Sequence, residues 1–149
     1  MARSLLMHMG NRRAADRTGA IEHEAAARYA SAMHSVSAMG DALLAARAAG
    51  ASISERRRLH ARVDQELVRA YGAADEMYHR LLTAAGGPQR GDTDPGVQLW
   101  KRRLNTALTV RSQHQLAEID DAGVLAPAAV APLTRAAYGP HQAGMDFEH

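Results

Sequence analysis

Apolar positions along this chain recur every three or four residues, the spacing of a helix that buries one face. The clearest stripe consists of Ile21, Ala25, Tyr29, Ala32, Val36, Met39, Leu43 and Ala46. It predicts a helix that begins near Thr18 or Gly19 and ends at Gly50, because glycine suits the conformation that follows a helix. Residues 1–18 hold a short apolar patch and several arginines, and we expect them to be a flexible N-terminal segment.

A second stripe follows after a very short link and consists of Leu59, Val63, Leu67, Ala70, Ala74, Met77 and Leu81. Ser52 and Glu55 have the S-x-x-E spacing of a capping box, in which each side chain binds the other residue's free backbone amide. Gly72 interrupts the stripe and weakens the middle of the helix. We therefore expect residues 19–85 to form a long antiparallel helical hairpin.

The segment 86–94, GGPQRGDTD, is rich in turn-forming residues and is expected to be a loop. Asp94 and Pro95 suit the N-cap and the first position of a third helix. Its expected apolar face is Val97, Trp100, Leu104, Leu108, Ser112, Leu116 and Ile119. Gly123 would end this helix and Pro127 would open a short returning helix, so that residues 95–139 make a second hairpin.

These patterns predict an all-α protein of one domain, in which two αα-hairpins pack as a small bundle and residues 140–149 form a tail. Hydrophobic residues make up 46% of the chain but aromatic residues only 4%, and much of the remainder is alanine. Long alanine-rich helices leave apolar stripes uncovered, so we expect the protein to form a homodimer.

Charge and composition exclude several classes of function. The 18 basic residues nearly balance the 16 acidic ones, whereas a nucleic-acid binder typically has a concentrated excess of basic residues. The absence of cysteine excludes disulfides and thiol catalysis, and fits a cytoplasmic protein. Two basic triplets, Arg56-Arg57-Arg58 and Lys101-Arg102-Arg103, are candidates for contacts with anionic lipids, a partner or phosphates, and solvated helix faces are the alternative.

No catalytic motif is evident, so we expect neither an enzyme nor a cofactor. The sequence has no glycine-rich phosphate loop and no convincing nucleophile and base. The paired carboxylates Asp75-Glu76 and Asp120-Asp121 diverge by about 100° on a helix and are not expected to converge on one substrate atom. The second pair lies at the end of a helix, where it would bind a cation or cap the corner.

Histidine and methionine supply the remaining candidates. Five histidines in the expected helices are candidate pH sensors, with ordinary surface titration as the alternative: His23, His34, His60, His79 and His114. Methionine and histidine also occur side by side, and Met33, His34, Met77 and His79 are a weaker candidate site for Cu(I) or Ag(I), which prefer such soft ligands.

One family resemblance suggests a function. The run Leu104, Leu108, Arg111, Gln115, Leu116, Gly123-Val124-Leu125, Val130 and Leu133 resembles the end of the cytoplasmic C-terminal tail of bacterial sodium/proton antiporters of the monovalent cation:proton antiporter-1 family. Residues 4–10, 25–44 and 59–71 resemble earlier parts of that tail. This chain departs from the family in the final short helix, where Pro127, Ala128, Ala129 and Pro132 replace the usual acidic residues.

The resemblance implies a cytosolic regulatory module at the inner face of the membrane, dimeric and positioned beneath a membrane transport domain. It would bias transport according to pH or a bound effector, with the histidines as proton sensors and the arginines facing acidic lipids or the transport domain. The alternative is a free-standing helical adaptor or a nucleic-acid-associated protein that uses its arginine-rich helix faces.

Overall fold

The structure, a computed structural model, describes the backbone of residues 2–122 and the side chains of residues 10–122. Its four helices are α1 (Ala2–Ala48), α2 (Ile53–Ala84), α3 (Pro88–Gly91) and α4 (Pro95–Asp121). Within residues 2–122 there is no strand, which confirms the all-α prediction. None of the described helices combines the length and the apolar character that crossing a membrane requires.

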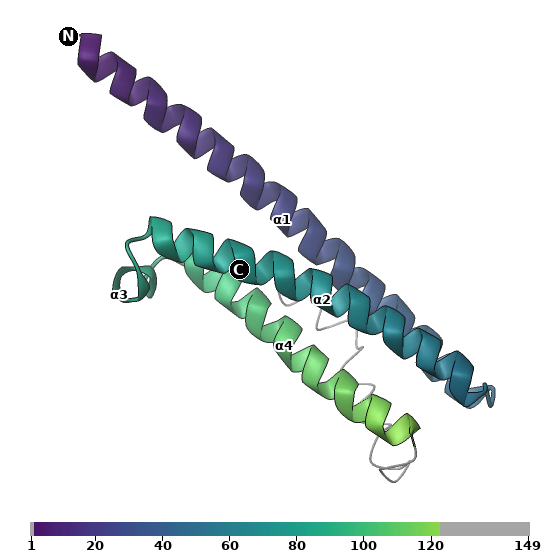
Figure 1. Cartoon of the computed structure of the whole chain (residues 1–149). Helices are drawn as coiled ribbons and strands as arrows, with labels where there is room; N and C mark the ends of the chain where they lie inside the picture. Colours follow the sequence, from purple (N-terminus) through teal and green to yellow (C-terminus); the bar gives the residue numbers. More distant parts are fainter. Residues whose placement is uncertain (1, 123–149) are drawn as a thin grey trace.

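Helix α2 is the centre of the arrangement (Figure 1). It runs antiparallel to α1, with which it forms the expected long hairpin, and α4 runs antiparallel along another side of α2. The N-terminal part of α1 extends beyond the other helices, and residues 10–20 are all exposed. The three long helices therefore pack as a small bundle. The returning helix and the tail expected after Gly123 lie outside the described residues.

Local sequence signals fix most helix ends. Gly50 has a φ of 71° and follows the end of α1, as expected. Both bonds of the Ser52–Glu55 capping box are present at the start of α2. Asp94 caps α4 through a 2.9 Å bond from the backbone N–H of Val97, and Pro95 occupies the first helical position.

Two expected boundaries are wrong. Helix α1 begins at Ala2 rather than near Thr18, because the basic N-terminal stretch contains good helix formers and continues the helix. The expected loop 86–94 contains the helical turn α3, which Pro88 opens and whose residue Gly91 is buried.

The core confirms the first two apolar stripes. The largest fully buried side chains at these positions are Tyr29, Leu43, Leu67 and Met77, surrounded by buried alanines that let the helices approach closely. Trp100 of α4 is also completely buried, and its ring meets that of Tyr29 edge to face at 6.4 Å.

The expected face of α4 is wrong beyond its first turns. Leu108, Leu116 and Ile119 are 40–42% exposed, and Ser112 is exposed as well. The buried face instead consists of Val97, Trp100, Arg103, Ala107, Val110, His114, Ala117 and Asp120. Small and polar side chains occupy this interface because the buried polar groups find partners on α1 and α2, as described next.

Candidate functional site

Buried and half-buried charged side chains gather where the end of α1, the start of α2 and the end of α4 meet. Arg47 donates to Asp120 at 2.8 Å, and its Nε lies 3.0 Å from Asp121 Oδ1. Arg56 adds a longer contact of 3.8 Å with Asp121. The adjacent carboxylates Asp120 and Asp121 thus contact two different nitrogens of one guanidinium, in keeping with the expectation that they do not converge on one atom. The cation that they bind is an arginine of the same chain.

Two imidazoles lie beside this charged group, between α2 and α4. His60 is 1% exposed, and its Nε2 lies 2.5 Å from Asp121 Oδ2. The ring of His114, fully buried, packs against that of His60 with a centroid distance of 4.9 Å. The pair is therefore inside the bundle, at the interface of two helices.

Burial, and after it the electrostatic interaction with His60, lower the pKa of His114 from 6.5 to about 4. Asp64 and Asp121 oppose these effects by favouring the charged imidazole, as does a hydrogen bond to the backbone of His60. Asp64 Oδ1 lies 3.5 Å from His114 Nε2. His114 is therefore neutral at pH 7, and in the folded chain it takes up a proton only near pH 4.

Two carboxylates from different helices, Asp64 of α2 and Glu118 of α4, lie beside His114. One ligand atom each of Asp64, His114 and Glu118 lies within 4.8 Å of the other two. A cavity of about 340 Å³ adjoins this group and is lined by Ile53, Arg56, Arg57, His60, Glu118, Asp121 and Ala122. Solvent therefore reaches this cluster beside Glu118, and the buried member of the three is His114.

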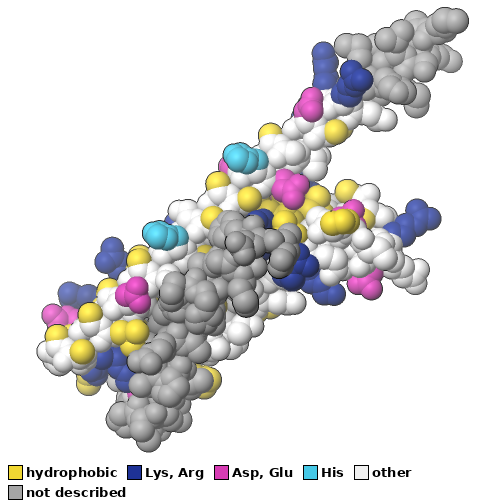
Figure 2. Space-filling view, turned by 180° about the vertical axis from the view of Figure 1, so that it is seen from behind, with side chains coloured by type: hydrophobic (Ala, Val, Ile, Leu, Met, Phe, Trp, Pro, Cys, Tyr) yellow, Lys and Arg dark blue, Asp and Glu magenta, His cyan; other side chains and the backbone are white. Residues whose placement is uncertain are grey.

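The other three candidate pH sensors do not join this cluster. His23, His34 and His79 are exposed, and histidine side chains are visible on the surface of the long helix α1 in Figure 2. Nδ1 of His79 lies 2.9 Å from the backbone oxygen of Asp75, one turn earlier in α2. These three residues occupy the solvated positions that the alternative interpretation expected.

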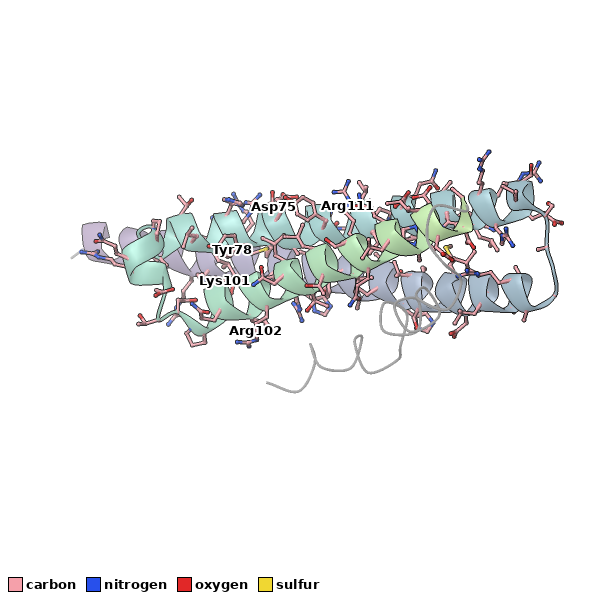
Figure 3. All side chains as sticks on the ribbon, turned by 90° about the horizontal axis from the view of Figure 1, so that it is seen from below. Asp75, Tyr78, Lys101, Arg102 and Arg111 are labelled. Carbon is pink, nitrogen blue, oxygen red and sulfur yellow. The ribbon has the colours of Figure 1, made fainter. Side chains whose placement is uncertain are left out.

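In each basic triplet, one arginine contacts other side chains of the bundle. Arg56 turns toward Asp121, and Arg103 is buried with its guanidinium 4.5 Å from the Trp100 ring centre. Contact of these two arginines with lipid, a partner or phosphate stays a prediction, which their contacts inside the bundle do not favour. The remaining members are exposed: Arg57, Arg58, Lys101 and Arg102. Figure 3 labels Lys101 and Arg102 on α4, with Arg102 directed away from the bundle.

The candidate soft-metal residues are divided between the core and the surface. Met33 and Met77 are 5% and 1% exposed and belong to the hydrophobic core. Their neighbours His34 and His79 are exposed. Adjacent residues on a helix point in different directions, so a thioether and an imidazole do not meet on one ion here.

Sequence reasoning missed Asp64 and Glu118. The available signal was the i, i+4 spacing of His60 and Asp64 and, separately, of His114 and Glu118, which places each pair on one helix face. Comparison with known proteins adds no further assignment, since no family model matches the chain and neither curated proteins nor solved structures give a significant match.

Proposed function

We propose that this chain is a non-enzymatic regulatory or interaction domain whose stability responds to pH through the His60–His114 pair. The observation that carries the proposal is the packing of two buried imidazoles across the α2–α4 interface. A switch needs a titratable group whose charge state affects the contact of two elements. His114 meets this need because burial keeps its imidazole neutral between about pH 4 and 6.5, where an exposed imidazole would take up a proton.

Protonation of His114 opposes the packing of α4 on α2. The new charge would be buried and would face the neighbouring imidazole of His60. The surrounding acidic groups, Asp64 of α2 with Glu118 and Asp121 of α4, compensate it only in part, since Arg47 of α1 already engages Asp121. Acidification therefore favours states in which α4 separates from α2, which changes the surface offered to a partner.

Thermal and urea unfolding between about pH 4 and pH 7.5 tests this proposal. The pKa of His114 is lower in the folded protein, so the unfolded chain binds more protons between about pH 4 and 6.5. Stability is complete above about pH 6.5 and falls as the pH drops toward 4. The difference in pKa corresponds to a loss of about 3 kcal/mol at most.

The variant His114→Gln removes the titration and should flatten this pH dependence, whatever its effect on stability at pH 7. His34→Gln, at an exposed position of α1, is the matched control and should keep the dependence of the unaltered chain. An unchanged pH profile in His114→Gln would reject the proposed sensor.

The resemblance to antiporter tails extends the proposal to a cytoplasmic position beneath a membrane transport domain. Membrane helices encoded in frame upstream of Met1 in the natural gene would support it, and their absence would favour an independent adaptor. The adaptor alternative, including association with nucleic acid, relies on the exposed Arg57, Arg58, Lys101 and Arg102. DNA binding that weakens steeply with salt would favour that alternative.

A further inference from the structure

We propose that Asp64, His114 and Glu118 form a binding site for a divalent first-row transition-metal cation. The three residues come from two antiparallel helices and place one nitrogen and two carboxylate oxygens within 4.8 Å of one another. The inference concerns the same cluster as the proposed function but does not depend on the pH response. It also differs from the Met/His site considered from the sequence, with which it shares no residue.

The geometry follows from two matching motifs. His60 and Asp64 are four residues apart on α2, and His114 and Glu118 are four residues apart on α4. Residues at this spacing lie on one helix face. Because the helices run in opposite directions and His60 contacts His114, the two motifs face each other across the interface. Carboxylate and imidazole side chains that project from facing helices hold metal ions in helical bundles.

The two carboxylates beside His114 are available to a cation, while Arg56 and Arg57 line the cavity that adjoins Glu118. Asp120 and Asp121 have Arg47 as a partner, whereas Asp64 faces an imidazole that is neutral at pH 7. Within residues 10–122, Glu118 takes part in no ion pair. A divalent ion would neutralise these two carboxylates. The imidazole needs no deprotonation to bind it, so proton competition is weak.

The ligand set also indicates the class of ion. An imidazole ligand suits Zn²⁺, Co²⁺ or Ni²⁺ better than Mg²⁺ or Ca²⁺, which prefer oxygen ligands alone. Bonds of about 2.0–2.2 Å require the ligand atoms to move closer together by about 1 Å. Asp64, whose side chain is 43% exposed, can make this movement while the buried His114 stays in place. Three protein ligands leave a coordination position for water, and the cavity lined by His60 and Glu118 supplies access.

Titration of the chelator-treated full chain with Zn²⁺ and Co²⁺ at pH 7 tests the site. We expect one ion per chain by calorimetry, a higher unfolding temperature, and visible Co²⁺ absorption of a site with nitrogen and oxygen ligands. Asp64→Asn and Glu118→Gln keep the shape of the side chains and should each weaken binding at least about tenfold. His114→Gln should abolish the Co²⁺ spectrum.

The matched control is the exposed pair Asp75 and His79, which has the same i, i+4 spacing on α2 and a 3.3 Å contact. Asp75→Asn and His79→Gln should leave metal binding unchanged. Binding that is absent, that survives Asp64→Asn and Glu118→Gln, or that is lost in the control variants would overturn the metal site. None of these results affects the pH profile of the metal-free chain, which tests the proposed function separately.

Discussion

Arg103 shows how a charged residue can anchor two helices from inside the bundle. Its guanidinium lies over the ring of Trp100 at 4.5 Å and near that of Tyr29 at 5.6 Å. The Tyr29 hydroxyl donates to the backbone oxygen of Arg103 at 3.1 Å, and the Trp100 indole donates to Glu22 at 3.0 Å. These contacts join α1 to α4 directly, and the flat guanidinium is suited to stacking on aromatic rings.

Replacing Arg103 with alanine should therefore destabilise the protein by about 2 kcal/mol, through lost stacking and lost packing of its aliphatic stem. The neighbouring Arg102→Ala, at an exposed position, should change stability by less than about 0.5 kcal/mol. Urea unfolding at pH 7 measures both. Equal effects of the two substitutions would contradict a role for Arg103 in holding α1 on α4.

At the scale of the helices, replacing each of two glycines with alanine should change the stability of the protein in opposite directions. Gly72 is exposed in the middle of α2, and an added Cβ meets nothing within 4 Å. Gly72→Ala should stabilise by up to about 1 kcal/mol, because alanine loses less backbone entropy in a helix.

Gly50→Ala should instead destabilise by about 1 kcal/mol or more. This site is equally open, but its φ of 71° is unfavourable for any residue with a Cβ. Thermal unfolding of both variants and of the unaltered chain measures the difference. A destabilising Gly72→Ala would show that the middle of α2 is not a regular helix in solution.

The sequence predicts these helices better than it predicts which face of α4 is buried. Caps and periodic apolar residues mark α2 and the start of α4, since both are local signals. On α4 the leucine row is the more hydrophobic face, yet beyond the first turns the buried residues are Ala107, Val110, His114, Ala117 and Asp120. The choice depends on partners far along the chain, such as Arg47 for Asp120, which periodicity does not register.

The same limit applies to the candidate site. Asp120 and Asp121 could be recognised as a group that binds a cation, but Arg47 could not be identified as that cation, because it is 73 residues from Asp120 in the sequence. His60 and His114 could be listed as titratable residues, while their contact depends on the register of α2 against α4. The facing arrangement of Asp64 and Glu118 required that register as well.

At the scale of the whole molecule, the exposed row of α4 suggests where the interface of the homodimer expected from the sequence lies. Leu108, Leu116 and Ile119 lie on one side of α4 and are each 40–42% exposed within the described part of the chain. A second copy of this row would cover it by the same hydrophobic burial that holds the core together. We therefore expect the dimer interface to include this face.

Sedimentation equilibrium tests this assignment. The unaltered chain should sediment as a dimer, and Leu116→Glu should sediment as a folded monomer with an unchanged helical circular dichroism spectrum. Gln115→Glu adds the same charge at the adjacent exposed position and should stay dimeric. A monomeric unaltered chain would disprove the homodimer. A Leu116→Glu variant that stays dimeric would place the interface elsewhere, because a charge buried at the contact without a partner costs several kcal/mol.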